Sequence, residues 1–304
     1  MKKRVWVVGD LLIDRYLEGY TDHLCSEAPF PIYTITNVHD QAGGAWNLAL
    51  NLEAAGLDVF TLGVAGTEGI ITPVQDLAFP CGNVFTVLDS KRRTQVKTRV
   101  FAQYSTQVFR YDTPKDGLIS SDAVAALEGA MQSVAERRPP DAIVLQDYGC
   151  GVVTSEVRRL LSTSYASVPV FLGPYPTTDF GAYGSVDFMK CNTLEWRAFA
   201  REMKPRDLRD IASICVVTGG ADPVLVYQDR ERFSVPPPVR EVVDPCGAGD
   251  AFMAYLVAGV LDRLQLREAV DLAAHAGAGA VSHRGVYVVP RAEVEAALME
   301  TGKN

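Results

Sequence analysis

The sequence has little of what binding to nucleic acid, to a membrane or to a structural metal would need. Of 304 residues, 29 are Lys or Arg and 37 are Asp or Glu, so the formal net charge is -8 and no basic block occurs. Nucleic-acid binding depends on many contacts between cationic side chains and phosphates, and we therefore expect no such partner. The four histidines do not show metal-binding spacing, and the cysteines form no CxxC pair.

Long hydrophobic runs are also missing. The N-terminal segment MKKRVWVVGDLLIDRY is interrupted by Asp10 and Asp14, which excludes a signal peptide or a membrane span at this position. The scattered cysteines predict free thiols in a reducing compartment rather than a disulfide framework. We therefore expect a cytoplasmic protein that does not bind a membrane.

What is present is enough apolar material for a large core, with 48% hydrophobic residues. From about residue 120, short apolar strands alternate with segments of helical periodicity. The predicted strands are 142–146, 168–172, 214–217 and 224–227, and the predicted helices are 121–136, 154–164, 249–262 and 267–282. This alternation is typical of an α/β fold with a parallel sheet covered on both faces, and ligands of such folds bind at the carboxyl ends of the strands.

The N-terminal third has a different pattern. Val5 to Val8 predicts a short buried strand that ends at Gly9-Asp10. Segments 31–39 and 94–111 alternate apolar and polar residues, which is typical of half-exposed antiparallel strands, and we expect them to form a small separate sheet. Between them, Gly43-Gly44 precedes a predicted helix that ends at Gly56, and residues 58–66 predict a further strand.

The strongest chemical signal is Asp244-Pro245-Cys246-Gly247-Ala248-Gly249-Asp250, followed by an apolar helical segment. Two glycines allow a tight turn into a helix, whose first N–H groups form an anion site. A carboxylate there can take a proton from a substrate hydroxyl while the N–H groups stabilise a transferred phosphoryl group. The alternative interpretation is an ordinary loop in which Asp250 caps the helix.

Four motifs in this order resemble the ribokinase-like (PfkB) carbohydrate kinases. They are Gly43-Gly44 with Asn47, Asn192-Thr193-Leu194-Glu195, Thr218-Gly219-Gly220, and the GAGD turn at 247–250. The resemblance covers nearly the whole chain. It implies a three-layer ribokinase-like domain over residues 1–304 with a mostly parallel central sheet, and a β-sheet lid formed by about 15–40 and 92–112. It also implies ATP and Mg²⁺ as cofactors, and a homodimer that pairs through the lid.

The resemblance also implies roles for individual residues. Asp250 would be the catalytic base, with the N–H groups of Gly247, Ala248 and Gly249 holding the developing charge. The substrate would be bound by Asp10, Asp14, Gly43, Gly44, Asn47, Lys97, Arg99, Arg110 and Asp147. The nucleotide would be bound by Asn192, Glu195, Thr218, Gly220, His275 and Gly279, and Asn192 and Glu195 would place Mg²⁺ through water. The turn from Ser282 to Gly285 resembles a monovalent-cation loop.

Several of these residues have simpler interpretations that stay open. Asp10 and Asp14 would be solvated loop carboxylates, and Asn47 a helix cap. Lys97, Arg99 and Arg110 would be exposed charges that prevent edge pairing of a strand. The small residues around His275 would serve close helix packing.

A closer resemblance is to the bacterial D-glycero-β-D-manno-heptose-7-phosphate kinases. The matching stretches are 9–16 (GDLLIDRY), 26–31 (SEAPFP), 43–47 (GGAWN), 97–99 (KTR), 110–112 (RYD) and 147–149 (DYG). This implies phosphorylation of heptose 7-phosphate at its anomeric hydroxyl, by a kinase that stands alone rather than fused to a second enzyme.

The chain departs from that family at positions near the expected cleft. Cys150 and Tyr175 stand where the family has lysines, and Lys190-Cys191 stands where it has Thr-Pro. Pro223 replaces a common glycine, and Pro245-Cys246 replaces a small β-branched or hydroxyl pair. Two further hypotheses therefore stay open. One is a kinase for another small sugar, polyol or nucleoside, and the other is a catalytically silent protein that binds a ligand or a partner.

Overall fold

The computed structural model describes residues 1–68, 83–102, 106–176, 183, 185–202, 212–228 and 231–301. Residues 103–105 of the predicted segment 94–111 lie outside this range. Within the described residues, no helix combines the length and the apolarity needed to cross a bilayer.

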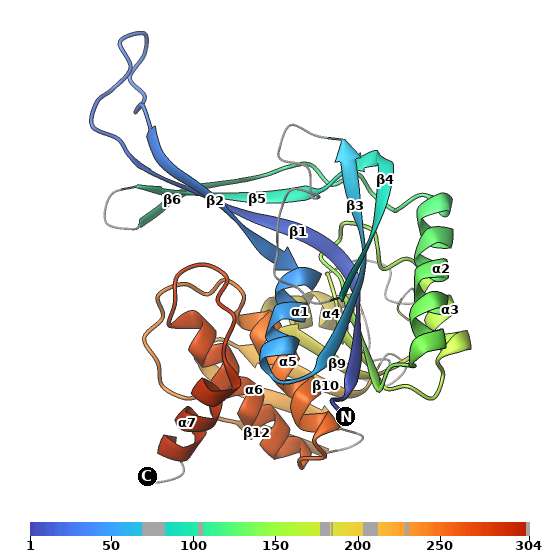
Figure 1. Ribbon diagram of the computed structural model, residues 1–304. Helices are drawn as coiled ribbons and strands as arrows, with labels where there is room; N and C mark the ends of the chain where they lie inside the picture. The colour runs from blue at the N-terminus through green and yellow to red at the C-terminus, as the bar shows by residue number, and fades with distance from the viewer. Residues whose placement is uncertain are drawn as a thin grey trace.

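A large, mostly parallel sheet forms the centre of the molecule (Figure 1). Its strands run in the order β12 (Glu231–Val235), β11 (Asp222–Gln228), β10 (Ala212–Gly219), β9 (Val186–Asn192), β8 (Val170–Gly173), β7 (Ala142–Gln146), β1 (Arg4–Tyr20), β3 (Asp58–Glu68) and β4 (Asn83–Arg93). The neighbours from β10 to β4 are parallel, and β11 and β12 form an antiparallel edge.

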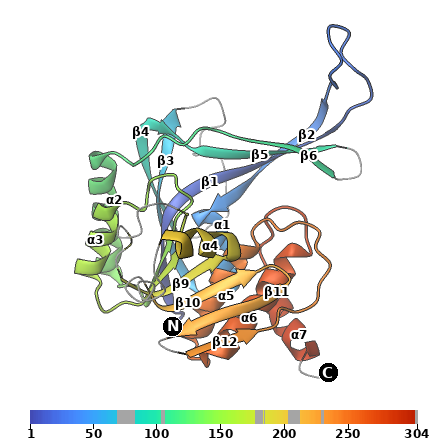
Figure 2. The same cartoon turned by 180° about the vertical axis from the view of Figure 1, so that it is seen from behind.

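Helices cover both faces of this sheet, which confirms the predicted three layers (Figures 1 and 2). One face packs against α1 (Ala45–Ala54), α5 (Ala248–Leu261) and α6 (Leu266–Val281), with α7 (Arg291–Thr301) beside α6. The other face packs against α2 (Ser121–Arg137), α3 (Ser155–Ser164) and α4 (Thr193–Glu202). Successive side chains of a strand point to opposite faces of the sheet, so β1 contributes to two cores. Val5 and Val7 pack in the core beneath α1, α5 and α6, whereas Trp6 and Val8 pack in the core beneath α2, α3 and α4.

The first strand does not end at Gly9-Asp10, as the sequence predicted, but continues to Tyr20. Residues 4–10 pair with β3 and β7 in the central sheet, and the rest of β1 pairs with β2 (Thr34–Gly44) and β5 (Gln95–Ala102) in a second sheet. A Cβ at Gly9 would collide with the Gln146 carbonyl oxygen, so glycine here permits close strand contact rather than a turn.

The second sheet, in the order β2-β1-β5-β6, projects from the body as the lid (Figure 1). β6 (Thr106–Asp112) forms its outer edge. The lid rises from the edge of the central sheet where β7, β8, β9 and β10 reach their carboxyl ends. The predicted chemistry-bearing segments follow these strands, and the fold thereby brings them together.

Candidate active site

The turn before α5 is held in place by Asp244. Its carboxylate accepts hydrogen bonds from the backbone N–H groups of Cys246 (2.9 Å) and Gly285 (3.0 Å). Gly247 adopts a left-handed conformation, with φ of 79°, which only glycine adopts without strain. A Cβ on Gly247 would approach the Asn47 amide nitrogen to 3.1 Å. The turn therefore requires glycine for its backbone and for the closeness of α1.

Asp250, in the first turn of α5, is only 4% exposed and accepts two side-chain hydrogen bonds. Asn47 donates to Oδ2 and the Tyr148 hydroxyl donates to Oδ1, both at 2.7 Å. Burial raises the pKa of Asp250, because the carboxylate loses solvation. The two hydrogen bonds and the positive charges of Lys190 and Lys97 oppose this rise. A carboxylate near a helix start with a raised pKa is well suited to accept a proton.

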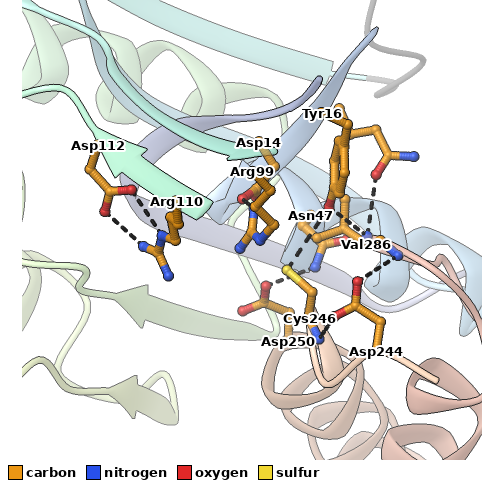
Figure 3. Close-up of polar contacts among 12 residues, drawn as sticks. Asp14, Tyr16, Asn47, Arg99, Arg110, Asp112, Asp244, Cys246, Asp250 and Val286 are labelled. Carbon is orange, nitrogen blue, oxygen red and sulfur yellow. Dashed lines mark hydrogen bonds and ion pairs between the residues drawn. The ribbon is translucent and has the colours of Figure 1, made fainter. Parts of the chain in front are cut away.

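Asn47 is fixed on α1 by its neighbour one turn later. Asn51 donates to the Asn47 backbone oxygen (3.0 Å) and side-chain oxygen (3.2 Å), and Asn51 itself accepts from the N–H of Val289. Asn47 is 1% exposed. It contacts the candidate base in this structure (Figure 3), and its predicted contact with substrate stays a prediction.

Asp10 lies completely buried at the carboxyl end of the core part of β1. Its Oδ2 accepts from the N–H groups of Tyr148 (2.8 Å) and Cys150 (2.9 Å), and its Oδ1 accepts from Val152 (3.0 Å). The structure therefore uses this carboxylate to anchor the loop after β7. These three donors reach both oxygens, and the predicted contact of Asp10 with the sugar stays a prediction.

Asp147 begins the same loop and is also buried. It accepts from the N–H of Gly149 (2.7 Å) and from the Tyr183 hydroxyl (2.5 Å). Burial, and then the neighbouring carboxylate of Asp10, raises the pKa of Asp147 to about 6. Asp147 is thus held by Gly149 and Tyr183, and its predicted contact with substrate stays a prediction.

Asp14 and Arg99 form a buried ion pair between two lid strands (Figure 3). Burial of a charged group is costly unless an opposite charge is close to it, and Asp14 and Arg99 are the ion-pair partners of one another. A Cβ at Gly43 would overlap the Asp14 carboxylate, so this glycine makes room for the pair. The Arg99 guanidinium also lies 5.6 Å from the centre of the Tyr16 ring. The two predicted sugar-binding residues therefore lie together.

Lys97 and Arg110, the other predicted cations of the lid, differ in their partners. Arg110 forms two hydrogen bonds with Asp112, at 2.9 and 2.7 Å. The Lys97 ammonium lies 4.3 Å from the centre of the Tyr148 ring, and no carboxylate among the described residues lies within 4 Å of it. Lys97 is thus a cation near the candidate base that has no carboxylate partner among the described residues.

Asn192 and Glu195 form a reciprocal cap at the start of α4. Glu195 accepts from the Asn192 N–H (2.7 Å), while the Asn192 side-chain oxygen accepts from Leu194 and Glu195, both at 2.9 Å. Within the described residues, no three His, Cys, Asp or Glu side chains converge on a metal position. The oxygen donors of this pair nevertheless fit a hydrated Mg²⁺ held mainly by substrate phosphates, because Mg²⁺ keeps several waters in such sites.

The predicted nucleotide residues lie in two places. Thr218 is the penultimate residue of β10, and its carbonyl accepts from the Thr193 hydroxyl; Gly220 follows the strand in a turn with φ of 68°. His275 and Gly279 line a cavity of about 190 Å³ that also includes Arg240, Ser282 and Glu293. The His275 ring lies within hydrogen-bond distance of the Asp271 carbonyl and the Thr301 hydroxyl, so its position is fixed. Nearby, the turn from Ser282 to Gly285 is bonded through its last N–H to Asp244.

Two residues at this site had no role in the sequence-based assignment. Tyr148 was noted only as part of a matching motif, and its hydroxyl reaches Asp250 from a loop that the sequence could not orient. Lys190 was noted only as a departure. A Cβ on Gly249 would lie 2.8 Å from its ammonium nitrogen, which places Lys190 against the first turn of α5. Its position two residues before Asn192 on one strand was the available signal, since such residues share a face.

Comparison with known proteins shows that the chain is similar to carbohydrate kinases. The family model "pfkB family carbohydrate kinase" matches residues 2–292. Bifunctional protein HldE of Histophilus somni is 28% identical over 98% of the chain, and that of Hyphomonas neptunium is 30% identical over 99%. In both cases the chain spans 64% of the relative's length.

Solved structures share the fold at lower identity. Phosphofructokinase-2 from Escherichia coli in complex with potassium superposes with a TM-score of 0.79 at 18% identity, covering 99% of this chain and 100% of that one. Ribokinase from Arabidopsis thaliana, complexed with ribose and ATP, gives 0.71 at 17% identity, covering 98% and 99%.

Proposed function

The chain belongs to the pfkB family of carbohydrate kinases, and we propose that it transfers the γ-phosphoryl group of ATP to the anomeric hydroxyl of D-glycero-D-manno-heptose 7-phosphate. The single observation that carries the mechanism is the position of Asp250, buried at the start of α5 between Asn47 and Tyr148. The heptose assignment is supported by the six stretches shared with the heptose-7-phosphate kinases, which lie in the lid, at its junction with α1 and in the loop after β7.

In the proposed reaction, Asp250 accepts the proton of the acceptor hydroxyl. The hydroxyl oxygen bonds to the γ-phosphorus, and the bond from that phosphorus to the β–γ bridging oxygen breaks, which releases ADP. The N–H groups of Gly247, Ala248 and Gly249 at the start of α5 stabilise the charge on the transferred group. Bound Mg²⁺ would neutralise the phosphate charge, and Asn192 and Glu195 would hold its water ligands.

Lys190 extends this machinery. A cation beside the positive end of a helix is electrostatically unfavourable unless an anion lies between them. Among the described residues, no carboxylate forms an ion pair with Lys190. We therefore propose that the γ-phosphate of ATP binds beside both the Lys190 ammonium and the first turn of α5, where Lys190 would contribute the charge that Cys150 and Tyr175 cannot supply.

Lys190→Met is expected to lower kcat/KM for ATP by roughly 10²-fold, similar to the loss of one donor to a developing negative charge. Initial-rate kinetics with saturating sugar measure this effect. Lys3→Met, which removes an exposed lysine paired with Asp141, is the matched control and should leave the rate unchanged. Equal rates for the two variants would exclude a phosphate contact for Lys190.

A second acceptor class is favoured by the ion pairs of the lid. Arg99 and Arg110 are each neutralised by a carboxylate, which leaves Lys97 as the charged group for a sugar phosphate. This arrangement would also suit an unphosphorylated sugar, a polyol or a nucleoside. The hypothesis of a silent binding protein is set aside, because the family consists of kinases and the chain retains the candidate base.

A panel of acceptors with ATP tests the assignment, with products located by phosphorus NMR. We expect heptose 7-phosphate to give a heptose 1,7-bisphosphate. Turnover of heptose, ribose or a nucleoside alone would keep the kinase mechanism and replace the substrate.

We further propose that the lid forms a homodimer and that residues 1–304 act as one kinase domain. The lid exposes large apolar side chains, and such surfaces on a β-sheet favour pairing between copies. They include Ile35, Val38, Val108 and Phe109, each at least 50% exposed. Sedimentation velocity tests the dimer.

A further inference from the structure

The candidate base is closed to substrate in this structure. Asp250 is 4% exposed, and both of its oxygens already accept hydrogen bonds from protein side chains. A general base must come within hydrogen-bond distance of the hydroxyl that it deprotonates. Because Asp250 is almost completely buried, we expect one of the two partners that cover it to move before the sugar can bind.

Asn47 is the immobile partner. Its side chain is bonded to Asn51 within the same helix, and it is 1% exposed. Tyr148, by contrast, is half-buried and lies on a loop. The backbone of that loop is fixed, because Asp10 accepts from the Tyr148 N–H and Lys115 donates to its carbonyl (2.6 Å). Only the side chain of Tyr148 is left to rotate.

The Tyr148 hydroxyl occupies the position that we expect for the sugar hydroxyl that accepts the phosphoryl group. It donates to Asp250 Oδ1 at 2.7 Å, the same interaction that a sugar hydroxyl makes with its base. The face of its ring packs under the Lys97 ammonium, which comes from lid strand β5. The ring is thus held between the lid and the base, at the place where sugar must enter.

We propose that the Tyr148 hydroxyl stands in for the acceptor on Asp250 until the sugar displaces it. This inference rests on the proposed role of Asp250 as the base. While the hydroxyl is bonded, water cannot donate its proton to Asp250 and attack the γ-phosphorus, so ATP is not hydrolysed. Tyr148 is accordingly a gating residue, and the sugar must overcome its hydrogen bond in order to bind.

Tyr148→Phe tests the inference, since it removes the hydroxyl and keeps the ring under Lys97. ATP hydrolysis without sugar is expected to rise about tenfold, because water gains access to the base. The KM for sugar should fall by up to about tenfold, as expected when a hydrogen bond to a charged group no longer competes, while kcat stays within about threefold. Tyr175→Phe removes the hydroxyl of a tyrosine whose ring lies beside Gly149, and it should change none of these values.

The pH dependence of kcat/KM tests the gating role separately, because it would not change if Tyr148 had only a structural role. The groups that face Asp250 are Asn47, Tyr148, Lys190 and Lys97, and all four lower its pKa. Loss of the Tyr148 donor therefore raises the pKa of Asp250. The acid limb of kcat/KM should move to higher pH by about one unit in Tyr148→Phe.

The double variant Tyr148→Phe with Asp250→Asn separates the possible failures. Loss of the additional ATP hydrolysis in this variant would show that the water is activated by Asp250. Unchanged hydrolysis in Tyr148→Phe, with a lower kcat and an unchanged KM, would overturn the gating role and show that Tyr148 stays bonded throughout catalysis. Full turnover by Asp250→Asn alone would instead overturn the base assignment.

Lys97→Met gives an independent check that leaves the tyrosine in place. Without the ammonium over the ring, the hydroxyl is held less firmly, and sugar-independent hydrolysis should rise about two- to threefold, consistent with the loss of one cation–π contact. A fall in hydrolysis would contradict the inference. Melting temperatures within a few degrees of the wild type confirm that each variant is folded.

Discussion

Asp250→Asn is expected to lower kcat by roughly 10²- to 10⁴-fold, with little change in the affinity for ATP. The amide keeps the shape of the side chain and can still accept one of the two hydrogen bonds from Asn47 and Tyr148, but it cannot take a proton. Because burial already raises the pKa of the carboxyl group, its removal also lowers the cost of burying this position. The variant should therefore fold at least as well as the wild type.

The measurement is single-turnover phosphoryl transfer, with nucleotide binding followed separately by calorimetry. Asp262→Asn is the matched control, since Asp262 caps the other end of the same helix and pairs with Arg291 at the surface. It should retain full activity. Turnover by Asp250→Asn within a few-fold of the wild type would exclude general-base catalysis by this residue.

The second large effect is expected on stability. Asp10→Ala removes the acceptor for three buried backbone N–H groups, those of Tyr148, Cys150 and Val152. Each unsatisfied donor costs about 1–3 kcal/mol, and partial relaxation gives a total loss of roughly 3–5 kcal/mol. For a chain of this size that corresponds to a fall in melting temperature of roughly 10 °C.

Asp10→Asn gives an intermediate test. An amide oxygen in place of Oδ2 can still accept from Tyr148 and Cys150, but the NH₂ group would then face the Val152 donor. Thermal and urea unfolding should rank the wild type above Asp10→Asn and Asp10→Ala last. Asp262→Ala, which breaks an exposed ion pair, should cost less than about 1 kcal/mol. A stable Asp10→Ala protein with a raised KM for sugar would restore the sequence-based role of Asp10 as a sugar ligand.

The sequence predicted the framework well where a local pattern determines the structure. The helices expected at 121–136, 154–164, 249–262 and 267–282 correspond to α2, α3, α5 and α6 within one or two residues, because their periodicity and ends are local properties. Strands β4, β9 and β12 and helices α4 and α7 were not predicted. These elements are stabilised by packing in the assembled fold, and a local sequence pattern does not show such packing.

The sequence predicted individual residues of the candidate site but not the contacts between them. Asp250 and Asn47 were both singled out, yet their contact joins residues 203 positions apart. The sequence could not show that Asp14 would be neutralised by Arg99, or that Asp10 would turn inward to the loop after β7. Each of these depends on the direction of a side chain within the assembled fold, and several alternatives have similar local preferences.

The continuity of β1 has a mechanical consequence. One strand of 17 residues supplies an inner strand of the central sheet and then an inner strand of the lid, without a loop between them. The lid therefore has no hinge within β1. Its opening must bend or twist a continuous, hydrogen-bonded strand along its length. An elastic element of this kind returns to one rest position, so the force on a bound sugar grows steadily with the displacement of the lid instead of vanishing once the cleft is open.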